Sequence, residues 1–417
     1  MSMQSNMQSN MQSKSLMRIY NKNKILDLIR KNQSIYRAEL ARSTGLSMPT
    51  IMSITDELVE DGLIRDVGKG ISSGGKPPML LEIIPDSHFF VGIDISGAMF
   101  KCIVLNLQGN IVHSRCQDKD SLPEAELIET IERFIEDTVK EAGVSPARVS
   151  GIGVGLPGLV DTSRGVVINS IDYNLHDVDL FTPLHEHFRT HVYIENSSKL
   201  MAIGEKYFGA GTNCEDFALV TVGRGIGAAL IINGELYRGH YNMSGELGHM
   251  VINPSGPICK CGRQGCLETL ASGKAIASQA RNLVSTGSNS LMLSLAGGIV
   301  KKINCDIVFS AAAQGDVLAK RIADEAIDYL SIGLANLVSL FDCQRIVLTG
   351  YVVKNNTYLL DKVSDNINTT RSCYYGDVPV EVRLSELGEE AAVIGAAALP
   401  LQSFVMQPGV RFPIAMN

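Results

Sequence analysis

Residues Gly245–Glu268 read GELGHMVINPSGPICKCGRQGCLE, and this stretch decides how the chain around it folds. It holds one histidine and three cysteines with the spacing H-x9-C-x-C-x4-C. Imidazole and thiolate are ligands that Zn2+ prefers, and four protein ligands leave no position open for water. Ordinary reduced cysteines are the alternative, but Gly262 and Gly265 permit the tight backbone that gathers several thiolates. The spacing therefore predicts a structural zinc site formed by His249, Cys259, Cys261 and Cys266.

Length and composition predict a globular protein of two or three domains. The chain has 417 residues, of which 45% are hydrophobic and 19% charged. No segment has the roughly 18 apolar residues of a membrane span, and the N-terminal MSMQSNMQSNMQSK lacks the apolar core of a signal peptide. We expect a cytoplasmic protein without membrane contact, whose polar residues 1–14 are disordered. The other six cysteines are expected to be reduced core residues: Cys102, Cys116, Cys214, Cys305, Cys343 and Cys373.

Basic residues gather near the N-terminus, although the formal net charge is −7. Eight lysines and arginines lie between Lys14 and Arg42, against two acidic residues. A basic run is most often a solvated helix face. It indicates nucleic-acid binding only where a further pattern supports it.

That further pattern is a helix, a glycine turn, another helix and a wing. Apolar spacing predicts helices over Asn21–Lys31 and Tyr36–Ser43, and a third helix that Ser47 caps. Two strands, Leu63–Val67 and Met79–Ile84, flank the segment GKGISSGGK. We predict a winged helix-turn-helix over residues 15–85 whose second motif helix enters the major groove, the alternative being a three-helix protein-docking module. The residues predicted nearest the bases, phosphates or minor groove are Arg37, Ser47, Met48, Pro49, Thr50, Ser53 and Lys76.

Two glycine-rich hairpins predict an α/β body after this module. FFVGIDISGAMFKCIVLNLQGNIV from Phe89 and VTVGRGIGAALIINGELYRG from Val220 each indicate strand, turn and strand, and a helix over Glu124–Ala142 follows the first. Such a pair is typical of the phosphate loops of the two-lobed actin-like ATPase or sugar-kinase fold. We expect a first lobe over 88–196 with about 388–400, a second lobe over 197–387 and a C-terminal tail over 401–417.

Together these motifs resemble the ROK family, named for repressors, open reading frames and kinases, from about Asn21 to Leu399. The zinc stretch and the winged helix ending in SSGGKPP are similar to the regulator branch of that family. The resemblance implies a homodimer or homotetramer that binds a monosaccharide or a derivative in the cleft between its lobes. It also implies that the sugar hydroxyls are held by Asn174, Asn196, Glu246, His249 and Glu268. Buried carboxylates, amides and imidazole suit hydroxyls, which both donate and accept hydrogen bonds.

Four departures from the kinase pattern of that family imply that no useful kinase activity remains. Ser197 stands where family kinases carry an aspartate, the usual acceptor of the sugar proton. The first phosphate loop, Asp94-Ile95-Ser96-Gly97-Ala98, has lost a glycine and a threonine of D-x-G-G-T. In two further loops Arg224 replaces a small or hydroxyl residue and Tyr351 replaces a glycine.

The sequence therefore predicts a sugar-responsive transcriptional regulator rather than an enzyme. We expect a repressor of carbohydrate-utilisation genes that binds operator DNA, a sugar effector and structural Zn2+; the sequence does not set the sign of the response, which leaves an activator, a co-repressed regulator or control by a partner protein as alternatives. One alternative is an active sugar kinase with an appended DNA-binding domain. Another is a DNA-binding scaffold that no longer binds sugar.

Overall fold

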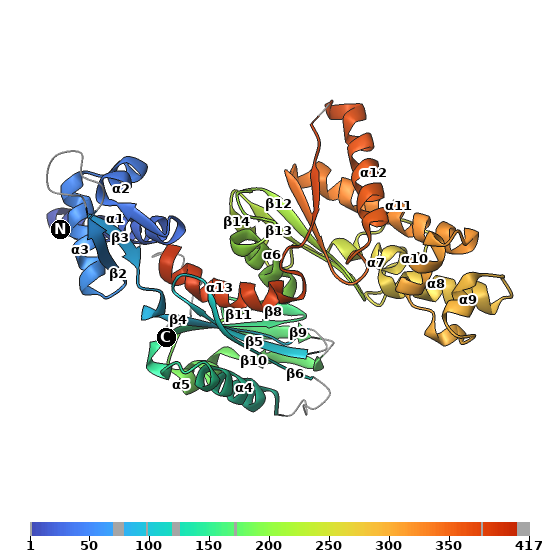
Figure 1. Cartoon of the computed structure of the whole chain (residues 1–417), viewed down its shortest axis with the longest axis horizontal. Helices are drawn as coiled ribbons and strands as arrows, with labels where there is room; N and C mark the ends of the chain where they lie inside the picture. Colours follow the sequence, from blue (N-terminus) through green and yellow to red (C-terminus); the bar gives the residue numbers. More distant parts are fainter. Residues whose placement is uncertain are drawn as a thin grey trace. The chain divides into compact units, whose positions relative to one another are not determined.

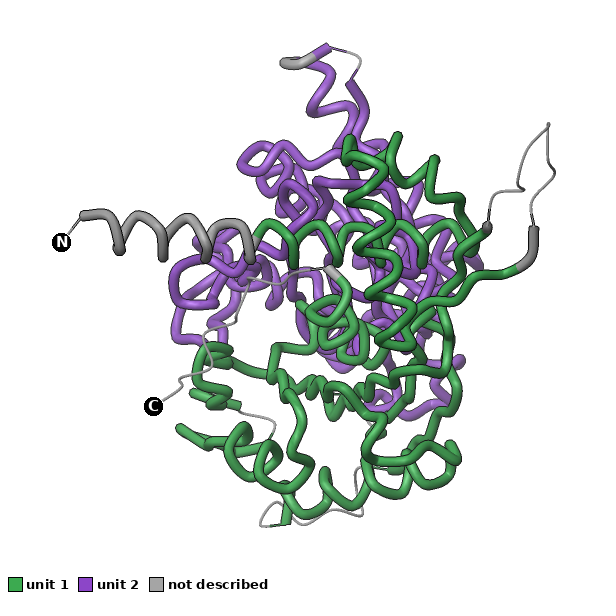
Figure 2. The backbone as a smooth tube through the Cα atoms, turned by 90° about the vertical axis from the view of Figure 1, so that its left-hand side faces the viewer, with its two compact units in different colours: residues 1–200, 393–417 green, residues 201–392 purple. Residues whose placement is uncertain are grey.

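The structure is a computed structural model, and it describes residues 2–69, 79–96, 99–118, 126–170, 173–376 and 378–406. The chain divides into two compact units, residues 1–200 with 393–417 and residues 201–392 (Figure 2). Among the helices of the described ranges, none is both long enough and apolar enough to cross a membrane.

The first unit begins with a winged helix-turn-helix module (Figure 1). Strands β2 and β3 form an antiparallel wing; residues 70–78 between them, with the predicted DNA contact Lys76, lie outside the described residues. A third strand, β1, pairs with β3 and gives the order β1-β3-β2. The elements are α1 (Ser2–Lys31), β1 (Ser34–Tyr36), α2 (Arg37–Thr44), α3 (Met48–Glu60), β2 (Ile64–Lys69) and β3 (Met79–Ile83).

Local sequence sets the bounds of α2 and α3. Gly45 has a left-handed φ of 73°, and its N–H donates to the Ala41 carbonyl at 2.9 Å, which ends α2. Ser47 caps α3, because its Oγ accepts from the Thr50 N–H at 3.4 Å, and Pro49 follows in the first turn. These features confirm the predicted helix-turn-helix. Its buried core contains Ile25, Ile29, Leu40, Ile51, Ile54, Leu58 and Leu81.

Helix α1 extends further toward the N-terminus than the composition indicated. Its bounds begin at Ser2, whereas the polar repeats predicted disorder for residues 1–14. Glutamine, methionine and lysine have good helix propensity, and extending a helix costs far less than nucleating one.

The first α/β lobe, in the same unit, has a five-stranded sheet of order β11-β7-β4-β5-β6. Strands β11, β7 and β4 are parallel, while β5 is antiparallel to both its neighbours. A three-stranded antiparallel sheet has the order β10-β9-β8. The elements are β4 (Phe89–Asp94), β5 (Met99–Asn106), β6 (Ile111–Asp118), α4 (Leu127–Glu141), β7 (Val149–Leu156), β8 (Leu159–Asp161), β9 (Val166–Ser170), β10 (Leu175–Asp179), α5 (Phe181–Phe188) and β11 (Val192–Asn196).

Helices α4 and α5 cover one face of the five-stranded sheet, and α13 (Ala391–Met406) covers the other (Figure 1). The side chains facing α4 are apolar, whereas Gly92 and Gly153 face α13, where an added Cβ would clash with the α13 backbone. The tail predicted over 401–417 overlaps this helix, since residues 401–406 complete α13 and Val405 is buried. Pro400 lies inside α13 and packs over Gly151. Residues 407–417 lie outside the described ranges.

The second unit carries a five-stranded sheet of order β14-β13-β12-β15-β16. The predicted strand, turn and strand from Val220 are β12 and β13, and the long helix α11 supplies much of the core. The elements are α6 (Ser197–Phe208), which begins at the end of the first unit, β12 (Phe217–Val222), β13 (Ile226–Ile232), β14 (Glu235–Tyr237), α7 (Glu268–Ala271), α8 (Gly273–Ser285), α9 (Leu291–Leu295), α10 (Cys305–Ala313), α11 (Val317–Phe341), β15 (Arg345–Thr349), α12 (Thr357–Tyr375) and β16 (Glu381–Leu384).

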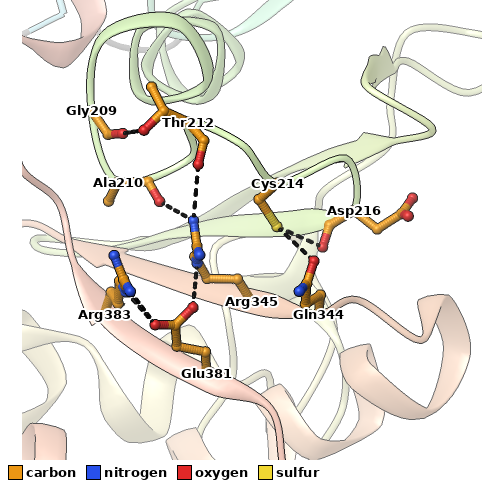
Figure 3. A network of polar contacts seen from close by, with 9 residues as sticks. All are labelled: Gly209, Ala210, Thr212, Cys214, Asp216, Gln344, Arg345, Glu381 and Arg383. Atoms are coloured by element: carbon orange, nitrogen blue, oxygen red, sulfur yellow. Dashed lines mark hydrogen bonds and ion pairs between the residues drawn. The ribbon is translucent and has the colours of Figure 1, made fainter.

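Arg345 ties the loop after α6 to this sheet (Figure 3). Its Nε donates to Glu381 Oε2 at 2.7 Å, and a terminal nitrogen donates to the Ala210 carbonyl at 2.6 Å. Because the guanidinium is largely buried, its loss would leave the Glu381 carboxylate and the Ala210 carbonyl without this donor. The network fixes the position of the α6–β12 connection.

The six cysteines outside the predicted zinc cluster differ in exposure. Cys102, Cys214, Cys305 and Cys343 are buried and free, as predicted. Cys116 and Cys373 are exposed, so the prediction of core positions is wrong for these two. Cys116 lies on β6, an edge strand whose outward positions face solvent.

Candidate metal centre and effector site

The predicted zinc ligands lie on a loop that reverses direction between β14 and α7. His249 ends a short 3-10 turn, Leu247–His249, after which Val251 pairs with Cys266 and Ile258 pairs with Gln264. The reversal brings the histidine and the three cysteines together. Their ligand atoms all lie within 4.8 Å of one another, and the members of this cluster are His249, Cys259, Cys261 and Cys266.

The distances inside the cluster fit a tetrahedral metal ion. Zinc bonds of about 2.3 Å to sulfur and 2.0–2.1 Å to nitrogen place two sulfurs about 3.8 Å apart, and sulfur and nitrogen about 3.6 Å apart. The Sγ atoms of Cys261 and Cys266 are 3.7 Å apart, and Cys259 Sγ lies 3.5 Å from His249 Nδ1. The cluster is therefore compatible with a structural metal ion held by four protein ligands.

The cysteines of the cluster differ in the pKa of their thiols. The Arg263 N–H donates to Cys261 and lowers the pKa of that thiol to about 6. Burial raises the pKa of the Cys266 thiol to about 12. Metal ions bind thiolates rather than thiols, so binding here must release protons and must weaken as the pH falls.

Gly265 is the residue that permits the reversal. Its φ is 73°, an added Cβ would overlap the Asn253 carbonyl oxygen, and its own carbonyl accepts from the Ile252 N–H at 2.9 Å. We expect Gly265→Ala to lose metal and to lower the free energy of unfolding by about 3 kcal/mol or more, because the backbone must move. Gly262→Ala is the matched control, with a φ of 85° but nothing within 4 Å of the added Cβ. Metal content and thermal denaturation compare the two variants, and equal losses in both would contradict this role of Gly265.

The carboxylates of Glu246 and Glu268 differ in their exposure and in the partners that they already have within the protein. His249 directs Nδ1 toward the thiols and Nε2 toward Glu246, whose Oε2 lies 4.0 Å away. The Glu246 side chain is 66% exposed and accessible to a ligand. Glu268 is largely buried, accepts from the Ile226 N–H at 3.3 Å and lies 3.5 Å from Lys260 Nζ. A metal ion on Nδ1 would fix the direction of Nε2.

The five predicted sugar contacts are divided between the two units, with Asn174 and Asn196 in the first. Asn174 is exposed directly before β10 and has a left-handed φ of 49°. Asn196 ends β11, where its Oδ1 accepts from the Ser198 N–H at 2.9 Å and its Nδ2 donates to the Gly158 carbonyl at 2.8 Å. Asn196 thus caps α6 and uses one of its two amide hydrogens within the protein.

Ser197, at the position of the missing aspartate, is bonded to the first glycine-rich hairpin. Its Oγ donates to Asp94 Oδ1 at 2.7 Å, and Ser96 Oγ donates to Asp94 Oδ2 at 2.9 Å. Asp94 is buried, and this burial raises its pKa. A neutral hydroxyl cannot accept a proton at neutral pH as a carboxylate does. Gly97 and Ala98, the rest of the altered loop, lie outside the described residues.

Tyr351 packs against the turn between β12 and β13. Its ring lies 3.6 Å from the place of an added Cβ at Gly223, and it closely contacts Gly273. The Gly273 N–H donates to the Gly223 carbonyl at 2.8 Å, which makes this corner compact. Arg224 is exposed in the turn itself. The Tyr351 ring thus occupies the space beside the β12–β13 turn, which is the segment predicted to resemble a phosphate loop.

Helix α3 presents an exposed face on the winged helix. Met48, Pro49 and Ser53, which were predicted to lie near DNA, all face solvent, and Thr50 is half-buried with its Oγ1 2.8 Å from Ser47 Oγ. Met52, which the prediction omitted, is also exposed. Its place four residues after Met48, on the same side of a helix, was the available signal.

Arg37 is held inside the module rather than projecting from it. Its Nε donates to Thr55 Oγ1 at 2.9 Å, and its terminal nitrogens reach Asp66 at 3.1 Å and Asp56 at 3.2 Å. The side chain therefore ties α2 to α3 and β2. Other members of the basic run are also paired, since Arg18 and Lys22 contact the carboxylate of Glu57 on α3.

Two family models match the chain. One, described as ROK family, matches residues 90–403, and one described as winged helix-turn-helix DNA-binding matches residues 20–65. The chain belongs to the ROK family. The winged helix of this ROK protein is thus a DNA-binding type of module by sequence as well as by fold.

Relatives of this ROK protein carry the names of sugar repressors. One named xylose repressor, from Caldicellulosiruptor bescii, is 30% identical over 395 residues, which are 94% of this chain and 98% of the relative. One named N-acetylglucosamine repressor, from Escherichia coli O157:H7, is 30% identical over 396 residues, which are 92% of this chain and 93% of the relative. Both similarities extend over the winged helix and the body.

Solved structures of the ROK family match to different extents. A ROK family transcriptional regulator, described as a homolog of the E. coli MLC protein, has a TM-score of 0.80 at 26% identity and covers 93% of this chain and 97% of its own. A ROK hexokinase from Thermus thermophilus has a TM-score of 0.62 at 29% identity and covers 74% of this chain and 96% of its own. The hexokinase is matched nearly whole, yet part of this chain has no counterpart in it.

Proposed function

We propose that this ROK protein is a sugar-responsive transcriptional repressor of carbohydrate-utilisation genes, and that it is not a kinase. The observation that carries the proposal is a winged helix with an exposed α3 face on the same chain as a body in which Ser197, bonded to Asp94, replaces the catalytic base. Relatives named as sugar repressors support it. Operator DNA and a monosaccharide or derivative would then be its two ligands.

In this proposal the N-terminal part of α3 reads base edges in the major groove. Met48, Pro49, Thr50 and Ser53 lie nearest the bases, while Ser47 caps the helix that carries them. Arg37 positions α3 through Thr55 and the two aspartates, and Lys76 meets phosphate or the minor groove. A homodimer or homotetramer places two winged helices on the two half-sites of a palindromic operator.

The sugar hydroxyls are proposed to meet Glu246, His249 and Glu268 from the second unit and Asn174 and Asn196 from the first. The metal ion is proposed to be Zn2+ with a structural role, because the ligand set is one imidazole and three thiolates and is complete. Sugar binding changes the affinity for DNA if the sugar binds one conformation of the protein better than a second conformation that differs in DNA affinity.

Glu246→Ala tests the effector site. The carboxylate is exposed and beside His249, and a hydrogen bond between a charged group and a hydroxyl contributes about 1.5–3 kcal/mol. The concentration of a releasing sugar needed for half release should therefore rise at least about 10-fold, with operator affinity unchanged in its absence. Asp361→Ala, which removes an exposed carboxylate on α12, should behave as wild type. A Glu246→Ala protein that responds at the wild-type concentration would exclude Glu246 from the site.

Ser197→Asp tests the rival kinase function. We expect no release of ADP from Mg-ATP and a hexose panel by either the wild type or this variant, because Arg224 still stands in the turn between β12 and β13 and Tyr351 still packs against that turn. The added carboxylate faces buried Asp94 and should lower the free energy of unfolding by about 1–3 kcal/mol. Ser198→Asp, at the same helix start but without the Asp94 contact, is the stability control. Hexose-dependent ADP release by the wild type would establish the kinase instead.

A further inference from the structure

The turn between β5 and β6, residues 107–110, contacts the end of α1 in the winged helix. Gln108 Nε2 donates to the Arg30 carbonyl at 2.7 Å, and an Arg30 terminal nitrogen donates to the Gln108 carbonyl at 3.4 Å. The Arg30 carbonyl belongs to the last turn of a helix, where no backbone N–H follows to bond it. This reciprocal pair, here called the Arg30–Gln108 clasp, joins the DNA-binding module to the first lobe.

The environment of the Arg30 side chain favours the orientation of the winged helix in which the clasp forms. It is only 11% exposed, and its other terminal nitrogen donates to Asp27 Oδ1 at 3.3 Å. Arg30 Nε is buried and has no hydrogen-bond partner in the described part of the chain. An orientation of the module that broke the Gln108 contact while keeping Arg30 away from water would leave this cation with fewer partners still, and it is therefore disfavoured.

The same turn holds the linker that follows β3. The Leu107 N–H donates to the Pro85 carbonyl at 2.9 Å, and Asn106 Nδ2 donates to Asp86 Oδ1 at 3.1 Å. Asn106 is buried, and its Oδ1 accepts from the Asn110 N–H at 3.0 Å, which fixes the shape of the turn. Module and linker are therefore both bonded to one short element of the first lobe.

We propose that Gln108 is a positioning residue for operator recognition. The Arg30–Gln108 clasp holds the winged helix in one orientation on the first lobe and so sets the half-site spacing that the protein accepts. Two modules on a symmetric operator read half-sites about 34–36 Å apart, or a multiple of that distance. A module hinged freely on its linker tolerates other spacings, whereas a held module does not. This inference rests on the proposed function, since it requires operator binding.

The test uses the full-length protein and the DNA sequence that it protects upstream of its own gene. Affinity is measured for that duplex and for a duplex with five base pairs inserted between the half-sites, which turns one half-site by about half a helical turn. Wild-type protein should lose at least about 30-fold in affinity on the insertion. Gln108→Ala should lose no more than about threefold, while binding the original duplex within about threefold of wild type.

Ser114→Ala, an exposed position on β6 of the same hairpin, is the matched control and should discriminate as wild type does. A Gln108→Ala protein with wild-type discrimination overturns the proposal. If the wild type protects no DNA, the proposed function is wrong, and hydrogen exchange then tests the clasp itself. Amides of residues 28–32 and 107–110 should exchange faster in Gln108→Ala than in Ser114→Ala, and equal rates overturn the contact.

Discussion

We expect the Cys261→Ser variant to purify without zinc, to unfold at lower temperature and to lose its response to sugar. A serine hydroxyl is a poor zinc ligand at neutral pH, and four-ligand zinc sites in small domains contribute about 10–16 kcal/mol of apparent binding free energy. Cys261 is exposed, so its replacement leaves no cavity and reports on the metal. A loss of about 3 kcal/mol in the free energy of unfolding corresponds to a fall of roughly 10 °C in Tm for a unit of this size.

Zinc per chain after dialysis, calorimetric melting and the sugar response are measured together. Cys116→Ser, which alters an exposed cysteine on β6 outside the cluster, is the matched control and should keep one zinc per chain. Retention of zinc by Cys261→Ser, or the same loss in both variants, would refute the ligand assignment.

The second large effect is expected from Met48→Asp. Met48 is the first residue of α3 and is 41% exposed, so a carboxylate there interacts favourably with the helix N-terminus and should not destabilise the fold. On operator DNA the same carboxylate replaces an apolar contact and meets the phosphate field. Operator affinity should fall about 10- to 100-fold, since a base contact in the major groove carries about 1–3 kcal/mol.

Fluorescence anisotropy at fixed salt measures this affinity, because phosphate contacts make it strongly salt-dependent. Val112→Asp introduces the same charge at an exposed position of β6 and controls for net charge. If Met48→Asp binds operator as tightly as Val112→Asp, the N-terminal part of α3 does not face the bases.

The winged helix and the α/β body could be predicted because their signals are local. Ser47, Pro49 and Gly45 act within one helical turn, and both glycine-rich hairpins show strand, turn and strand over contiguous residues. Strand β1 was missed because three residues are too few to show an alternation. Residues 388–400 were expected in the first lobe, but the packing of α13 on Gly92 and Gly153 was not predicted, because the contacting residues lie about 240 to 300 positions apart in sequence.

The metal cluster could be predicted from spacing alone, since all four ligands fall within one loop. The environment of Arg37 could not, because its three partners come from α3 and β2 and turn a basic residue into an internal tie. For the same reason the sequence indicated only that Ser197 stands in place of an aspartate. Its bond to Asp94, over 103 residues of sequence, required the fold.

The most direct test of the central claim is binding of the full-length protein to DNA upstream of its own gene, with and without each member of a sugar panel. Anisotropy is recorded at one salt concentration throughout. The account predicts tight binding to this DNA and at least about a 10-fold loss of affinity in the presence of one monosaccharide or derivative. The Glu246→Ala variant should bind the DNA as tightly but should be less sensitive to that sugar. Tight binding that no sugar alters would contradict this account. It would favour a DNA-binding scaffold whose body binds a different ligand.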